Sequence, residues 1–122
     1  MARSNPESII QTELCYYLNG KGYVFWRSNN TPVYDSSWGG YRKMAEFSQP
    51  GVSDITMVHK GRAVFIEVKT DKYLATKKSY QSKAQREFQQ WVESAGALYV
   101  VVRSVDDFIT FENNVLLHCG DN

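Results

Sequence analysis

The Lys60-Gly61 pair, which separates two β-prone runs, constrains the fold more than any other feature of the sequence. The runs SDITMVH and RAVFIEVK flank the pair, and glycine adopts the positive φ of a hairpin turn without steric cost. A two-residue turn pairs His59 with Arg62, and the same register places Asp54 opposite Glu67. A symmetric four-residue loop leaves this pairing unchanged. The sequence therefore predicts a β-hairpin with two acidic side chains facing each other across it.

Three charged side chains are expected on one face of this hairpin. Glu67 and Lys69 share a face because side chains alternate along a strand, and Asp54 lies opposite Glu67. Directly opposed Cβ atoms are about 5 Å apart, and at an effective dielectric constant of about 20 two carboxylates repel there by roughly 3 kcal/mol. A divalent cation would relieve this repulsion. Alternatively, the three groups are ordinary surface charges, or Lys69 forms a structural ion pair with one of the acids.

The remaining sequence predicts an α/β fold with a mixed four-stranded sheet flanked by helices. Capping residues at 4–7, 82 and 104 precede apolar residues at helical spacing. The expected order is helix, three strands, helix, strand and helix. The first helix starts within residues 4–7 and ends at Gly20 or Gly22, and a strand follows at residues 23–28. The two hairpin strands lie within residues 53–69, on either side of Lys60-Gly61, and are followed by a helix from 82 to about 94, a strand at 97–103 and a short helix from 105 to about 111. The first three strands can form an antiparallel meander. The helix at 82–94 is a crossover, so the last strand is expected to lie parallel to the Glu67 strand.

The composition fits one compact domain spanning residues 1–122. A chain of 122 residues suits a single domain, and 43% apolar residues are enough for a core and too many for disorder. No apolar run approaches the roughly 18 residues of a membrane helix, and the N-terminal segment lacks the apolar region of a secretory signal. Cys15 and Cys119 have no metal-ligand spacing around them, so we expect reduced thiols in a cytosolic protein.

Basic residues are concentrated in two segments, although the net charge is only +1. Between residues 71 and 86 a single acid accompanies five bases, which are Lys72, Lys77, Lys78, Lys83 and Arg86. Arg42 and Lys43 form a smaller cluster in a long polar loop at residues 29–50. Charge runs of this kind are either solvated faces or contact surfaces for phosphates. The second interpretation is favoured for the larger cluster because it begins directly after Lys69.

Two more residues are candidates for the same site. Glu13 borders the core-facing stripe of the first helix, either as a solvated edge residue or as a third acid near Asp54. Gln85 follows Ser82 by three residues, which is the spacing of a capping box and requires no chemistry. The first turn of a crossover helix also lies near the end of the preceding strand, however, and so within reach of Glu67.

The sequence contains four short motifs on matching elements: Arg27-Ser28-Asn29-Asn30, Gly51-Val52-Ser53-Asp54, Glu67-Val68-Lys69 and Ser82-Lys83-Ala84-Gln85. Together they resemble the VRR-NUC branch of the PD-(D/E)XK nucleases, over a region from the first helix to Arg103. The family also carries an acid in its first helix, and Glu13 matches it. One departure is the absent proline beside the first acid, since Pro50 lies four residues earlier. The resemblance implies a restriction-endonuclease-like fold with an αβββαβ core.

The resemblance implies a metal-dependent DNA endonuclease whose catalytic residues are Glu13, Asp54, Glu67, Lys69 and Gln85. The two facing carboxylates and the Val68 main-chain carbonyl would bind Mg²⁺ or Mn²⁺, which are hard cations that prefer oxygen ligands, and Glu13 would act on the metal through water. Lys69 would orient the attacking water or stabilise charge on the phosphate. Gln85 would position Lys69 or the scissile phosphate.

The resemblance also implies DNA as the partner and no contact with membranes. The candidate nucleic-acid-binding residues are Arg27, Asn30, Arg42, Lys43, Lys77, Lys78 and Lys83. Some relatives select branched DNA such as four-way junctions, in repair, recombination or phage DNA processing, and a two-fold homodimer would suit such substrates. The family occurs in a stand-alone phage or bacterial form, which fits this length and a cytoplasmic location.

Two other functions are compatible with the sequence. A non-catalytic nucleic-acid-binding module could keep the fold, with Glu67 and Lys69 as a structural ion pair. A metal-dependent hydrolase of small phosphate esters is the more distant option. The intact set of two acids and a lysine favours a nuclease over the first, because a pure binder needs no facing carboxylates. The long aromatic loop and the basic connection favour a polymeric substrate over the second.

If Lys77, Lys78 and Lys83 contact phosphates, replacing all three with glutamine will weaken DNA binding equally for all sequences. Each lost contact should make the slope of log K against log salt shallower by about 0.9 on duplex DNA, because fewer counterions are released. Titrations in Ca²⁺, which we expect to bind without efficient turnover, measure this slope. Unchanged affinity and slope would show a solvated face, and the DNA path would then run over Arg42 and Lys43.

Overall fold

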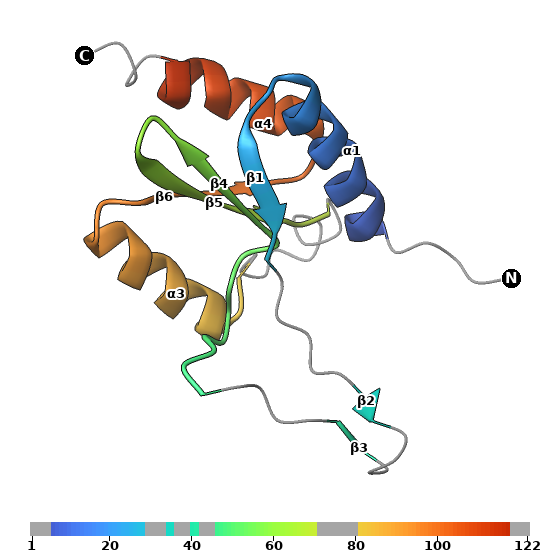
Figure 1. The fold of residues 1–122 in the computed structure, drawn as a ribbon, viewed down its shortest axis with the longest axis vertical. Helices are drawn as coiled ribbons and strands as arrows, with labels where there is room; N and C mark the ends of the chain where they lie inside the picture. The colour runs from blue at the N-terminus through green and yellow to red at the C-terminus, as the bar shows by residue number, and fades with distance from the viewer. Residues whose placement is uncertain (1–5, 29–33, 36–39, 42–45, 71–80, 118–122) are drawn as a thin grey trace, which may run out of the picture.

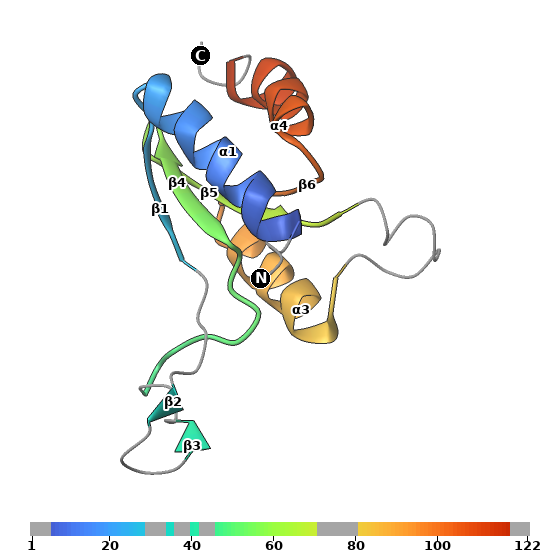
Figure 2. The ribbon, with the colours of Figure 1, turned by 90° about the vertical axis from the view of Figure 1, so that its right-hand side faces the viewer.

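The computed structural model describes residues 6–28, 34–35, 40–41, 46–70 and 81–117. Its main elements are α1 (Pro6–Gly20), β1 (Val24–Arg27), β4 (Ile55–His59), β5 (Arg62–Val68), α3 (Lys83–Ser94), β6 (Leu98–Val102), α4 (Val105–Phe111) and a π-helix, η1 (Glu112–Leu116). Two short strands, β2 (Tyr34–Asp35) and β3 (Gly40–Tyr41), pair with each other apart from the main sheet (Figures 1 and 2). Seven residues with predicted roles lie outside the described part of the chain: Asn30, Arg42, Lys43, Lys72, Lys77, Lys78 and Cys119.

The hairpin is built on the predicted two-residue turn. Both residues of Lys60-Gly61 have positive φ angles, 50° and 80°, as in the type I′ turns that match the twist of the flanking strands. The β4–β5 ladder begins with the pair His59 and Arg62. One pair beyond the far end of the ladder, the same register places Asp54 opposite Glu67. The predicted register is confirmed.

The sheet has the predicted mixed topology, with strand order β1-β4-β5-β6. The pairs β1–β4 and β4–β5 are antiparallel, whereas β5 and β6 are parallel. Parallel neighbours need a crossover connection, and α3 lies within it. The prediction of a mixed four-stranded sheet flanked by helices is therefore confirmed.

The helices begin and end close to their predicted limits. α1 ends at Gly20, and Ser82 and Ser104 cap α3 and α4 by accepting main-chain hydrogen bonds at 3.1 Å. α4 ends at Phe111 as expected, but the chain continues in helical form through η1. None of the helices in the described residues combines the length and apolarity needed to cross a bilayer.

Helices cover both faces of the sheet: α1 and α4 one face, α3 the other (Figures 1 and 2). The larger core includes residues from α1, the sheet, α4 and η1: Leu14, Leu18, Ile55, Met57, Val64, Ile66, Val68, Val102, Phe108 and Leu116. On the other face, Phe88 of α3 packs edge-on against Phe65 and Tyr99, with ring centroids 5.1 and 6.3 Å apart. The side chains of Asp54 and Glu67 are thus set at the end of a sheet whose register two packed layers hold.

A buried carboxylate ties η1 to α1 and β1. Glu112 is 1% exposed and accepts hydrogen bonds from the hydroxyls of Tyr17 (2.5 Å) and Tyr23, and Lys21 Nζ lies 3.8 Å from its Oε2. Burial and then this hydrogen bond raise the pKa of Tyr17 to about 12. The tyrosines therefore stay neutral donors, and the carboxylate is satisfied by its neighbours.

Candidate active site

Glu67 lies in surroundings that oppose its ionisation. Its side chain is almost fully buried, at 3% exposed. Burial, the charge of Asp54 and a hydrogen bond with that carboxyl raise the pKa of Glu67 to about 9, while Lys69 partly lowers it. Its Oε2 accepts a hydrogen bond from Gln85 Nε2 at 3.0 Å, whereas its Oε1 is buried and has no hydrogen-bond donor within the described residues. Such an oxygen is costly unless a proton or a cation occupies the position beside it.

Main-chain and hydroxyl groups hold Asp54 in place. Its Oδ2 accepts a hydrogen bond from the Val68 N–H at 2.8 Å, and its main-chain oxygen accepts one from the Ser28 N–H at 2.9 Å. Ser28 Oγ donates to the Ser53 carbonyl at 3.0 Å and accepts from Thr56 Oγ1 at 2.8 Å. The end of β1 and the start of β4 therefore lock the segment that carries Asp54 against β5.

The capping box of α3 also positions a side chain in the site. Ser82 Oγ accepts from the Gln85 N–H at 3.1 Å, and Gln85 Oε1 accepts from the Ser82 N–H at 2.9 Å. This leaves the amide nitrogen of Gln85 to donate to Glu67. The Gln85 side chain therefore completes the capping box through its Oε1 and contacts Glu67 through its Nε2.

Gly51 allows the segment before Asp54 to touch the first turn of α3. Its φ is +74°, and a Cβ atom at this position would lie 2.3 Å from the Ala84 carbonyl oxygen and 2.8 Å from the Gln85 nitrogen. Main-chain atoms cannot yield as a flexible side chain would. Any other residue here would displace the turn that carries Gln85, because the backbone of α3 itself makes the close approach to this glycine.

Lys69 extends β5 and places a buried cation beside the acids. Its N–H donates to the Val102 carbonyl at 2.9 Å, which continues the pairing of β5 with β6. The residue is 9% exposed, and its charge lowers the pKa of Glu67. One positive charge therefore faces the two predicted acids on this side of the sheet.

α1 brings Glu7, rather than the predicted Glu13, toward the site. Glu13 is exposed, whereas Glu7 is half-buried and its charge contributes to the raised pKa of Glu67. Glu7 shares its helix face with the buried residues Gln11 and Leu18, four and eleven positions later. Glu13 lies about 120° away from Glu7 around the helix axis. The spacing from the buried stripe was the signal that could have identified Glu7 from the sequence.

Two of the predicted nucleic-acid-binding residues are described by the structure. Arg27 on β1 is exposed, but its Nη2 donates to Gln11 Oε1 at 2.8 Å, so it links β1 to α1. Lys83 is the exposed first residue of α3. Lys83 therefore lies at the helix end nearest the acids, while Arg27 belongs to the opposite face of the sheet.

The donor set of the site fits a hard divalent cation. Carboxylate oxygens are the ligands that Mg²⁺ and Mn²⁺ prefer, and Glu67 Oε1 lacks a partner that a cation would supply. Within the described residues, no three side chains of His, Cys, Asp or Glu are grouped closely enough to form a metal site on their own. The two opposed carboxylates are the acids in direct contact, and Glu7 acts on them from farther away.

Comparisons with known proteins identify the fold. The sequence matches no family model and no curated protein. A solved structure described as a VRR_NUC domain protein superimposes with a TM-score of 0.64 and 17% sequence identity, over 95% of this chain and 93% of that chain. The chain has the VRR-NUC fold. The resemblance drawn from the four sequence motifs is thus confirmed for the VRR-NUC architecture.

The Glu67→Gln variant should be more stable than the wild type at about pH 8 when no metal is present. The folded state holds the Glu67 proton more tightly than the unfolded state, so wild-type stability should fall as the pH rises from about 5 to about 9. Glutamine keeps an acceptor for Gln85 and is neutral at every pH, so the variant avoids both the cost of binding a proton at pH 8 and any repulsion with Asp54, a gain of about 1–3 kcal/mol. Urea unfolding of the wild type and the variant in EDTA, at about pH 5 and about pH 8, measures the difference in their free energies of unfolding. A clearly less stable variant would instead indicate a stabilising ion pair between Glu67 and Lys69.

Proposed function

We propose that the protein is a divalent-metal-dependent endonuclease that hydrolyses phosphodiester bonds in DNA. One observation carries the proposal: Glu67 is buried against Asp54 with an oxygen that lacks a donor among the described residues. Holding two carboxyl groups in this way costs stability, and a catalytic metal site explains why both are present. The VRR-NUC fold supports the same class by analogy, because this domain is of the nuclease type.

Asp54 and Glu67 are the residues that would hold Mg²⁺ or Mn²⁺, with the Val68 carbonyl as a further oxygen donor. The hydrogen bonds from Val68 and Gln85 fix one oxygen of each carboxylate, and Glu67 Oε1 has no donor among the described residues. When bound, the ion would polarise the phosphodiester and lower the pKa of a nearby water.

The other residues of the site supply charge and orientation. Lys69 is a buried cation that can stabilise negative charge on the phosphate, because electrostatic interactions are stronger where water is excluded. Gln85 is a positioning residue that sets the orientation of Glu67. Glu7 adds a second negative charge near Glu67 from the side of α1 and is suited to accept a proton from the attacking water.

The first turn of α3 favours a phosphate polymer as the substrate. The N-terminus of a helix attracts anions, because its first N–H groups lack partners within the helix and the helix dipole is positive there. Lys83 and Arg86 are exposed on this turn, and Gln85 on the same turn contacts Glu67. A phosphate at the acids would therefore lie close to a helix terminus that favours negative charge.

Cleavage should require a divalent metal, and Asp54→Asn and Glu67→Gln should each reduce it below detection while circular dichroism shows an intact fold. The assay uses labelled single-stranded, duplex, nicked and four-way DNA with Mg²⁺, Mn²⁺ or EDTA. Nicked and four-way substrates are included because some members of the family that the motifs resemble select branched DNA. Full activity of either variant, or undiminished cutting in EDTA, would contradict the site. Tight DNA binding without any cutting would favour the non-catalytic binding module.

Glu7→Gln should reduce cleavage at least about tenfold, and Glu13→Gln should reduce it far less. The two substitutions remove the same charge from the same helix, but only Glu7 acts on Glu67 and shares the buried face of α1. Initial rates at saturating Mg²⁺ compare the variants directly, with melting temperatures as a control for folding. A larger loss of cleavage activity from Glu13→Gln than from Glu7→Gln would instead support Glu13, the acid selected by motif comparison.

A further inference from the structure

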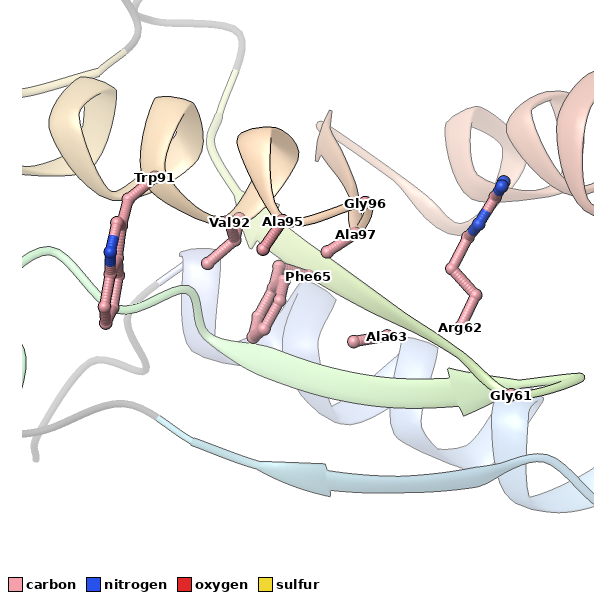
Figure 3. Close-up of a pocket in the computed structure, with 9 residues that line it drawn as sticks. All are labelled: Gly61, Arg62, Ala63, Phe65, Trp91, Val92, Ala95, Gly96 and Ala97. Carbon is pink, nitrogen blue, oxygen red and sulfur yellow. The ribbon is translucent and has the colours of Figure 1, made fainter.

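A second feature of the α3 face is an apolar groove beyond the acids. Its cavity of about 480 Å³ lies between the hairpin and the C-terminal half of α3 (Figure 3). The main apolar residues around it are Ala63, Phe65, Trp91, Val92, Ala95 and Ala97. In Figure 3 the rings of Phe65 and Trp91 extend into the same opening, whereas the Arg62 side chain points away from it. Trp91 is 60% exposed although it is a large aromatic residue.

Beside the groove, exposed apolar side chains continue across the same face of the sheet onto β4 and β1. Trp26 pairs with Thr56, which pairs with Phe65, so the three side chains lie in one row on the same face. Trp26 is 49% exposed, and the neighbouring Val24 and Val58 are 62% and 38% exposed. Contiguous apolar surface of this kind on a small domain is typical of a binding site.

The groove and the candidate active site share one surface. The next row of the same face contains Asp54 and Glu67, two residues along each strand from Thr56 and Phe65. Along α3, Gln85 and Trp91 are separated by six residues, which is about 9 Å. One helix therefore presents an anion-attracting terminus at the acids and an aromatic side chain at the groove. A DNA strand whose phosphate lay at the acids could place a neighbouring base in the groove.

We propose that this groove, lined by Phe65 and Trp91 and adjoined by Trp26 on the same face of the sheet, stacks an unpaired nucleobase of the strand held at Asp54 and Glu67. The inference rests on the proposed nuclease function and specifies its substrate: DNA with unpaired nucleotides beside the scissile phosphate. Bases stack on aromatic side chains with little regard to sequence, whereas the bases of a duplex are already stacked on each other. A concave opening with exposed rings suits a planar ligand better than a flat protein partner.

The test compares two labelled DNAs by fluorescence anisotropy in EDTA: a blunt duplex, and the same duplex with a single-stranded oligothymidine overhang. Trp91→Ala and Trp26→Ala should each weaken binding of the overhang DNA about 5- to 100-fold and leave binding of the blunt duplex unchanged. Trp91→Phe should retain most of the overhang affinity. Tyr16→Ala is the matched control, because Tyr16 is a 75% exposed aromatic residue on α1, which covers the other face.

Three results would overturn the proposal. The first is unchanged affinity of the Trp→Ala variants for the overhang DNA, and the second is an equal loss on both DNAs. The third is a dimer, seen by sedimentation, that these variants dissociate without changing overhang binding, which would make the groove a self-association surface. Because the assay contains no metal and no cleavage step, its outcome is separate from the effect of Asp54→Asn on cutting. Either proposal can therefore fail while the other stands.

Discussion

Asp54 and Glu67 face each other because a two-residue turn at the other end of the hairpin sets the register of β4 and β5. Side chains alternate with a period of two, so a slip of one residue would turn Glu67 toward the core beneath α1. The same slip would expose Ile66, which is fully buried in that core. The hydrophobic layer therefore holds in place a pair of acids that would otherwise separate. The repulsion in the site is sustained by packing elsewhere in the sheet.

α3 makes the second contribution, because its N-terminal cap and its contact with Glu67 use the same glutamine. Gln85 cannot adopt another rotamer without losing both of its side-chain hydrogen bonds, the one that its Oε1 accepts from the Ser82 N–H and the one that its Nε2 donates to Glu67. Gly51 packs against the same turn with no space for a side chain. The position of the Glu67 carboxylate is thus linked to the start of α3 and to the segment that carries Asp54. Pre-organisation of this kind is what a site that binds a phosphate and a cation requires.

The parts of the molecule that local rules determine were predicted from the sequence. Turn type and strand alternation gave the hairpin register, and the spacing of Ser82 and Gln85 gave the cap of α3. Motif comparison selects an acid by its position in a pattern, and it selected Glu13, which the structure shows to be exposed. Which acid of α1 approaches the site depends on the helix face that packs on the sheet, and that face carries Glu7.

Features that depend on distant packing could not be predicted in the same way. Trp26 lies in β1, at the opposite edge of the sheet from β6, against which α3 packs, and it is 49% exposed. The continuation of α4 into η1 is similar, since Glu112 is held by tyrosines 95 and 89 residues earlier in the chain. The hydrogen bond from Arg27 to Gln11, sixteen residues earlier, is another contact that depends on how α1 packs on the sheet.

Glu67 and Glu112 show how the same side chain serves two different purposes in one small domain. Both are buried, at 3% and 1% exposed. Glu112 receives hydroxyl hydrogen bonds on both oxygens and has Lys21 nearby, so its neighbours compensate its charge and it stabilises the fold. Glu67 faces another acid, and one of its oxygens has no donor among the described residues. Compensation within the protein is complete for one glutamate and incomplete for the other, and the incomplete site is the one suited to a ligand from outside.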